Sequence, residues 1–242
     1  MPSRFLYPPH FFVTEIVSLN ICEATQSPQT IASPEAVKPP TIIARTVPTW
    51  KRALDIVLSL VVGIVLSPVL VLIAIFIKCV SKGPVLYRQD RLGHGGEYFS
   101  ICKFRTLEIN AAGPHRDYIK SMERSEPAVK PKLDSFLITG GNFLRASSLD
   151  ELPQLINVLR GEMSLVGPRP DVLHIEDYEE RDLRRFEVLP GITGLWQVSG
   201  KNRLSQDEMI DLDVQYVDKV SPKLDLLIII RTFWVLLRQD NN

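Results

Sequence analysis

Apolar residues form one nearly continuous run, from Ala53 to Ile77, that dominates the hydropathy pattern of the chain. A helix of roughly 25 residues, rising about 1.5 Å per residue, is long enough to cross a hydrocarbon core of about 30 Å. Pro68 lies near the middle of the run and removes one helical hydrogen bond, while the adjacent Ser67 can satisfy the freed carbonyl. The run therefore predicts a membrane helix with a kink at Ser67 and Pro68.

Basic residues flank this run on both sides. Lys51 and Arg52 precede it, and Lys78 and Lys82 follow it. The positive-inside rule keeps both flanks on the cytoplasmic side, which favours a re-entrant helix over residues 49–82 that turns back within the membrane. Two alternatives stay open: a spanning helix kinked at its proline, and a simple anchor with no part in catalysis.

Beyond the run, the pattern of apolar and polar residues predicts two strands and several helices. Residues 83–105 have the pattern of two strands, joined by a glycine-rich turn at 93–96. Further helices are expected over residues 117–124, 175–186, 206–217 and 223–238. The last of these is apolar on most sides, so it is either a core helix or a helix that lies in the membrane interface.

Composition limits the class of protein. Residues 1–48 include a long stretch rich in Pro, Ser, Thr and Ala with few charges, which predicts a disordered tail or tether. The 28 basic and 28 acidic residues cancel, so no overall positive charge favours nucleic acid as a partner. Three widely spaced cysteines predict reduced thiols, with neither a zinc site nor a disulfide framework.

The stretch from Ser148 to Pro170, SLDELPQLINVLRGEMSLVGPRP, carries the strongest chemical signal. Asp150 and Glu151 lie just before or inside the first turn of an expected helix, which starts at Leu149 or at Pro153. Ser148 and Glu151 fit a capping box, and Gly161 marks the end of the helix. Carboxylates near the positive end of a helix dipole stay ionised. The pair suits a nucleophile for phosphoryl transfer, and it equally suits two ordinary capping carboxylates.

The hairpin region is locally basic, with Arg88, Arg91, Lys103 and Arg105 close together in sequence. Solvated strand faces often have this composition. Beside a membrane, the same four cations suit anionic lipid headgroups or a diphosphate.

Taken in order, the motifs of this chain resemble those of the bacterial sugar transferase family, the polyprenyl-phosphate hexose-1-phosphate transferases. The resemblance covers Trp50 to the C-terminus and rests on the kinked helix at Ser67 and Pro68, GPVLYRQDRLG, KFRTL, FLRASSLDELPQLINVLRGEMSLVGPRP and PGITGLWQVSGKN. It implies a mostly helical α/β, monotopic membrane protein: a re-entrant helix over 49–82 and a catalytic body over 83–242 with interfacial amphipathic helices. The implied location is the cytoplasmic face of the bacterial inner membrane.

The resemblance also implies an activity. Asp150 would attack the sugar-bearing phosphate of a UDP-sugar, release UMP and form a sugar-phosphoryl aspartate. Polyprenyl (undecaprenyl) phosphate would then attack this adduct, and the resulting lipid-linked sugar would initiate an exopolysaccharide, O-antigen or other glycan. The implied partners are therefore the UDP-sugar, the polyprenyl phosphate, membrane lipids and downstream glycosyltransferases.

Site residues follow from the same resemblance. Asp150 and Glu151 would form the protein side of a Mg²⁺ site, and Glu151 could instead orient Asp150 or act as a base. The expected phosphate partners are Lys103, Arg105, Arg145 and Arg169, with Pro168 and Pro170 fixing the direction of Arg169.

One segment departs from the family pattern. Residues 134–145 read DSFLITGGNFLR where the family has a sequence close to DPRITRIGRFLR, which removes a proline and up to three arginines. The loss is consistent with weaker diphosphate binding, a different substrate or an inactive homologue. A non-catalytic assembly subunit and a hydrolase that passes the same adduct to water therefore stay open, and neither the sugar nor the oligomeric state can be deduced from the sequence.

Overall fold

The computed structural model describes residues 42–109, 136–170, 175, 178–200 and 204–238, which all belong to one unit of the chain. The predicted tail, apart from its last residues, and the predicted helix at 117–124 lie outside the described residues. With η for a 3₁₀ helix, the elements are α1 (Thr49–Val80), β1 (Leu86–Leu92), η1 (His94–Gly96), β2 (Tyr98–Phe104), α3 (Gly141–Ala146), η4 (Leu149–Gln154), α4 (Leu155–Arg160), β3 (Ser164–Val166), η6 (Asp182–Glu187), β4 (Gly191–Thr193), η7 (Trp196–Val198), α5 (Gln206–Lys219) and α6 (Pro222–Arg238).

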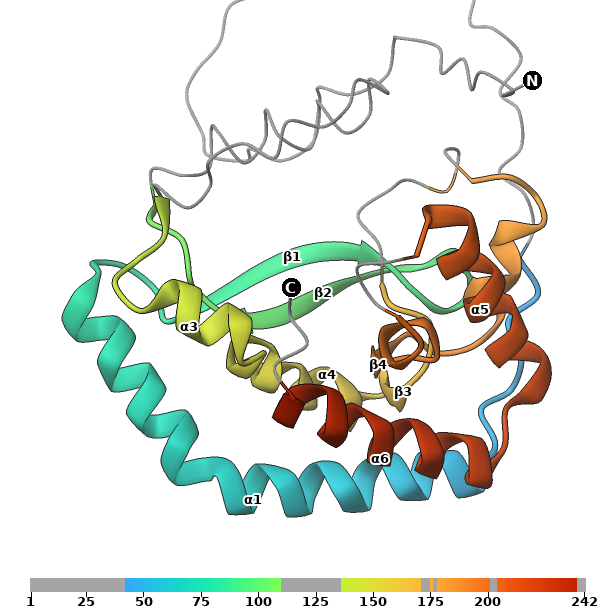
Figure 1. Cartoon of the computed structure of the whole chain (residues 1–242), viewed down its shortest axis with the longest axis horizontal. Coiled ribbons are helices and arrows are strands. Elements are labelled where there is room, and N and C mark those ends of the chain that lie inside the picture. The colour runs from blue at the N-terminus through green and yellow to red at the C-terminus, as the bar shows by residue number, and fades with distance from the viewer. Residues whose placement is uncertain (1–41, 110–135, 171–174, 176–177, 201–203, 239–242) are drawn as a thin grey trace, which may run out of the picture. The chain divides into compact units, whose positions relative to one another are not determined.

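The predicted membrane segment forms the single long helix α1, which bends visibly along its length (Figure 1). Pro68 lies inside it, and the Ser67 hydroxyl donates a hydrogen bond of 2.8 Å to the carbonyl of Ile64, the group that the proline leaves without a donor. In the described part of the chain, α1 alone is long and apolar enough to cross a membrane, and most of its apolar stretch is exposed. A core helix would instead bury these side chains.

Both ends of α1 pack against the rest of the unit. At the N-terminal end, the Lys51 ammonium is buried and donates to Asp225 (2.6 Å), Tyr216 (3.0 Å) and the carbonyl of Val166 (2.9 Å). At the C-terminal end, the buried Ile77 belongs to a core cluster that includes residues of β2 and α3.

The basic residues that precede the apolar run belong to the same helix. Lys51 and Arg52 lie within the first turn of α1. Arg52 donates to the carbonyls of Val158 (2.5 Å) and Leu159 (2.6 Å) at the end of α4. Lys51 and Arg52 therefore connect α1 to the body. For this reason their charges give only weak support to the prediction that was based on the positive-inside rule.

The predicted hairpin is confirmed. β1 and β2 pair antiparallel, with Leu86 opposite Phe104 and Leu92 opposite Tyr98. The turn between them uses Gly95 and Gly96 at positive φ, where glycine is the residue that adopts the conformation without strain. This hairpin lies along one side of η4 and brings Lys103 to the dyad (Figure 1).

A second, two-stranded sheet pairs β3 and β4 in parallel, with Ser164 opposite Gly191 and Val166 opposite Thr193. The backbones of Gly167 and Gly191 approach so closely that a Cβ on Gly191 would lie 2.1 Å from the Gly167 nitrogen. Only glycine fits at this crossing, which explains why the GPRP and PGITG motifs both carry it.

The two C-terminal helices form where the pattern predicts them. α5 begins with a complete capping box between Ser205 and Glu208. α6 is buried on one side, where Asp225 and Ile228 are fully buried, and the interfacial alternative for residues 223–238 stays a prediction. Its other side exposes large apolar side chains, namely Leu226, Leu227, Ile230, Phe233, Trp234 and Leu236.

The start of the motif stretch is where the local prediction is wrong. Ser148 has φ 56° and its side chain caps nothing, so the expected capping box with Glu151 does not form. The expected helix is split into the 3₁₀ helix η4 and the short α4, which does end at Gly161 in the left-handed conformation. The helix expected at 175–186 is likewise reduced, in its described part, to the 3₁₀ helix η6.

Candidate active site

The dyad lies in η4, between α3 and α4 (Figure 1). Two other segments converge on it: β2 supplies Lys103, and the Pro-Arg-Pro corner after β3 supplies Arg169. The site is thus assembled from residues that lie up to 66 positions apart in the sequence, which no local pattern indicates.

Glu151 is the electrostatic centre of this arrangement. Its Oε1 accepts hydrogen bonds from Lys103 Nζ at 2.8 Å and from Arg169 Nη2 at 2.7 Å, and its side chain is 16% exposed. Burial alone would raise the pKa of Glu151, but Arg169 and Lys103 outweigh burial and hold the pKa well below its usual range. Glu151 is therefore a permanent anion that fixes the two cations in place.

Asp150 has the opposite environment, although it is the adjacent residue. Within the described residues it forms no ion pair, while Glu151 next to it makes two. Burial, together with the charge of Glu151, raises the pKa of Asp150 to about 6, against the opposing influence of Lys103 and Arg145. Its carboxylate is partly desolvated and makes no direct ion pair among the described residues, which leaves its oxygens available to act as a nucleophile.

Hydrogen bonds to two of its backbone carbonyls hold the Pro-Arg-Pro corner in place. The carbonyl of Pro168 accepts from the Gly191 nitrogen at 2.8 Å, and the carbonyl of Arg169 accepts from Arg185 at 2.9 Å. Arg185 is buried and paired with the buried Asp213 at 2.7 Å. Sequence reasoning missed Arg185 and Asp213, since both lie in polar stretches where nothing in the pattern separates them from surface charges.

Two further residues predicted to act at the phosphate site, Arg145 and Pro170, lie in different surroundings. Arg145 is exposed, is oriented by a 2.9 Å hydrogen bond from its Nε to Thr106, and lies near enough to lower the pKa of Asp150. Pro170 is buried and lines a small cavity beside Lys103 and Arg169. Both positions are compatible with the predicted roles.

Arg105 is not where the prediction requires it. Its guanidinium is buried and donates to the carbonyls of Pro84 (2.6 Å), Leu107 (3.2 Å) and Ser81 (3.3 Å) and to the Ser81 hydroxyl (2.8 Å). These contacts tie the end of α1 to β2. The structure gives no support to the prediction that Arg105 binds phosphate, because its donors are used by the carbonyls of Pro84, Leu107 and Ser81 and by the Ser81 hydroxyl.

The acidic pair fits a Mg²⁺ ion only in part. The described residues contain no cluster of three or more His, Cys, Asp or Glu side chains. Mg²⁺, however, is usually held by one or two carboxylates together with substrate phosphates and water. Asp150 offers such a carboxylate, whereas Oε1 of Glu151 is already shared by two cations.

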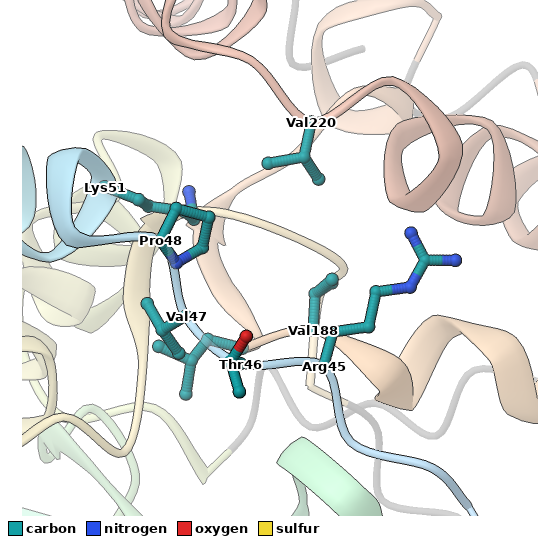
Figure 2. Close-up of a pocket in the computed structure, with 8 residues that line it drawn as sticks. Arg45, Thr46, Val47, Pro48, Lys51, Val188 and Val220 are labelled. Atoms are coloured by element: carbon teal, nitrogen blue, oxygen red, sulfur yellow. The ribbon is translucent and has the colours of Figure 1, made fainter.

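A cavity of about 170 Å³ lies elsewhere, at the start of α1 (Figure 2). Apolar side chains such as Val47, Pro48 and Val188 form much of its wall, and Arg45 at its edge is paired with Glu187. None of the dyad or phosphate residues lines it. We therefore place the candidate site at the dyad.

An acidic dyad held among cations, on a unit that carries one exposed helix of bilayer length, defines a membrane-associated protein suited to anionic substrates. The model of one family, described as bacterial sugar transferase, matches residues 46–239. The chain therefore belongs to the bacterial sugar transferase family.

Individual relatives agree with this assignment. The UDP-glucose:undecaprenyl-phosphate glucose-1-phosphate transferase of Caulobacter vibrioides is 39% identical over 79% of this chain and 71% of its own length. The exopolysaccharide production protein ExoY of Sinorhizobium fredii is 37% identical over 75% of this chain and 83% of its own. The undecaprenyl-phosphate galactose phosphotransferase of Salmonella typhimurium is 38% identical over 78% of this chain.

Not all of these relatives are matched along their whole length. The chain spans 41% of the Salmonella protein, and 41% and 42% of sugar transferases from Haemophilus influenzae and Streptococcus agalactiae. What is shared throughout is the segment that carries α1 and the dyad.

Proposed function

We propose that this protein transfers a sugar 1-phosphate from a UDP-sugar to polyprenyl phosphate and releases UMP. The observation that carries the proposal is the division between two adjacent carboxylates. Glu151 is paired with two cations, whereas Asp150 makes no ion pair among the described residues and has a raised pKa. Neighbouring acids with pKa values pushed apart commonly have separate tasks in catalysis. The names of the Caulobacter and Salmonella relatives support the same reaction.

In the first half-reaction, an oxygen of Asp150 attacks the phosphorus that bears the sugar. The bond from that phosphorus to the oxygen bridging the two phosphates breaks, and this oxygen leaves as part of UMP. The product is a sugar-phosphoryl aspartate. A covalent intermediate divides one difficult displacement between anions into two easier ones.

In the second half-reaction, a phosphate oxygen of polyprenyl phosphate attacks the same phosphorus and Asp150 leaves as a carboxylate. The attacking phosphate is already ionised, so no proton has to be removed. Glu151 is engaged by Lys103 and Arg169 and its pKa is low, which makes it a poor base. We assign it to positioning those two cations.

Charge on the diphosphate must be balanced in both steps. Lys103, Arg169 and Arg145 approach the dyad from β2, the Pro-Arg-Pro corner and α3, and they supply positive charge fixed before the substrate arrives. Asp150 with the substrate phosphates would hold Mg²⁺, which, when bound, neutralises developing negative charge on the phosphate oxygens.

We further propose that α1 is re-entrant and that the body lies on the cytoplasmic face of the inner membrane. Lys51 near the start of α1 bonds to Asp225 of α6, and Ile77 near its end packs with residues of β2 and α3. One body contacts both ends of the helix, and a straight span would separate those ends by a bilayer. The exposed apolar side of α6 would lie in the interface.

The function is tested by UMP release from the full-length protein in detergent or nanodiscs. The assay contains Mg²⁺, undecaprenyl phosphate and, in turn, each of a panel of UDP-sugars. Wild-type protein is expected to release UMP with at least one of them, and Asp150→Asn to lose the activity by at least about 10³-fold. Asp207→Asn, which alters an exposed carboxylate in the first turn of α5, is the matched control and keeps full activity.

Other outcomes decide against the proposal. UMP release that needs no lipid phosphate for turnover indicates a hydrolase. No turnover with any UDP-sugar indicates a non-catalytic member of the family. Undiminished activity of Asp150→Asn removes the aspartate from the mechanism.

A further inference from the structure

A small cavity lies beside Lys103 and Arg169, the two cations that pair with Glu151. Arg91, Lys103, Arg169 and Pro170 line it, together with Ile101 and Gln154. Its volume is about 10 Å³, close to the space that one water-sized group requires. It therefore admits a single oxygen atom with its immediate substituents, and neither a base nor a sugar ring.

Gln154 is the unusual member of this lining. The side chain is 2% exposed, and its Nε2 is buried without a hydrogen-bond partner among the described residues. A buried amide donor with no acceptor costs stability, so native structures rarely keep one. Where it borders a cavity beside cations, the missing acceptor is most simply a ligand oxygen.

The side-chain amide of Asn157, which lies nearby, is hydrogen-bonded through both its oxygen and its nitrogen. Asn157 is fully buried, its Oδ1 accepts from the Cys102 nitrogen at 3.0 Å, and its Nδ2 donates to the Ser100 carbonyl at 2.8 Å and to Glu162 at 2.7 Å. Gln154 lies three residues earlier, on the same segment as the dyad. Asn157 is therefore a structural amide, whereas Gln154 has a buried donor without a partner among the described residues.

We infer that the Gln154 amide donates a hydrogen bond to a phosphoryl oxygen of the sugar-nucleotide diphosphate. The three cations that line the cavity select an anionic oxygen, the amide supplies the matching donor, and the walls formed by Ile101 and Pro170 keep bulk water away. Gln154 lies one helical turn from Asp150 in η4, so this contact sets the position of the diphosphate relative to the nucleophile. The inference rests on the proposed function.

Two substitutions test it in the full-length protein. Gln154→Leu keeps the bulk and removes the donor, and Gln154→Glu keeps the shape and replaces the donor with a negative charge. The readouts are the melting temperature without ligand, the Kd for UDP by calorimetry, and the KM values for the UDP-sugar and undecaprenyl phosphate. UDP carries the diphosphate without the sugar, so binding is measured independently of turnover.

Gln154→Leu is expected to keep or raise the melting temperature, since it removes an unsatisfied buried group. It should weaken UDP binding about tenfold, the factor equivalent to ~1.4 kcal/mol, and raise the UDP-sugar KM similarly with little effect on the lipid KM. Gln154→Glu should weaken UDP binding further. The control Asn157→Leu behaves oppositely: it lowers the melting temperature and leaves the Kd for UDP of the folded protein unchanged.

Three results overturn the inference. They are an unchanged Kd for UDP in Gln154→Leu, a Gln154→Glu variant that binds UDP as tightly as wild type, and an effect confined to the KM for undecaprenyl phosphate. A wild-type protein that binds UDP through Gln154 but transfers no sugar contradicts the proposed function and leaves this contact standing.

Discussion

Asp150 and Glu151 are chemically similar side chains that the fold treats in opposite ways. Glu151 receives two cations at hydrogen-bonding distance, and Asp150 receives the charge of Glu151 and the cost of burial. The raised pKa means that the ionised form of Asp150 is held at a cost in stability. A carboxylate whose ionised form is destabilised in this way is typical of sites where folding free energy is given up for reactivity.

The Asp150→Asn variant should therefore be more stable than wild type at neutral pH when Mg²⁺ is absent. The folded protein holds the Asp150 proton with a pKa of about 6, above the ordinary value near 3.8, so ionisation destabilises the fold progressively between these values. We expect a gain of about 1 to 3 kcal/mol at pH 7.5. The gain should shrink as the pH falls through 6 and should be nearly absent at pH 4.

Chemical denaturation at the two pH values measures this effect. Asp207→Asn, at the exposed start of α5, serves as the control and should show no gain, because a carboxylate in a first helical turn is favourable. A destabilised Asp150→Asn at pH 7.5 would mean that the Asp150 carboxylate is satisfied in the folded protein, contrary to the environment described here.

At the scale of single elements, α1 determines how the site meets the membrane. The bend of α1, Pro68 within it and the contacts at both of its ends support the proposed re-entrant helix, which would enter and leave the membrane on one side. In that topology a polyprenyl chain would remain in the bilayer while its phosphate reached the dyad at the interface.

Thiol labelling tests this topology. Cys79 is an exposed native thiol near the end of α1, and Thr49→Cys introduces a second one at its exposed start. Each is studied alone, in variants that lack Cys22 and the other thiol. A membrane-impermeant maleimide should label both positions in inside-out vesicles and neither in intact spheroplasts, whereas labelling from opposite faces would contradict a re-entrant helix.

Elements with a strong local pattern were predictable from the sequence. The apolar run and the alternation around a glycine turn each determine a helix or strand through nearby residues. The parallel pair of β3 and β4 was not predictable, because strands of three residues carry no periodicity and depend on the contact between Gly167 and Gly191. The split of the dyad helix into η4 and α4 was also missed, because the local spacing of apolar residues does not indicate it.

At the scale of the whole described unit, the site depends on long-range contacts that residue type alone does not reveal. Lys103 lies in β2 and Arg105 directly follows that strand, yet Lys103 ion-pairs with Glu151 whereas Arg105 donates to the carbonyls of Pro84 and Ser81. The family resemblance suggested both as phosphate partners. Only the geometry separates them, and only the geometry shows the support that Arg185 and Asp213 give to Arg169.

The central claim is that Asp150 carries the sugar phosphate between donor and acceptor. Intact-mass spectrometry of the full-length protein, incubated with Mg²⁺ and the UDP-sugar that supports turnover but with no lipid phosphate, tests it directly. We predict a mass increase of one sugar phosphate, located at Asp150 by peptide mapping, with release of no more than one equivalent of UMP. Addition of undecaprenyl phosphate should then discharge the adduct. An active protein that never gains this mass, or that gains it at another residue, would contradict the account.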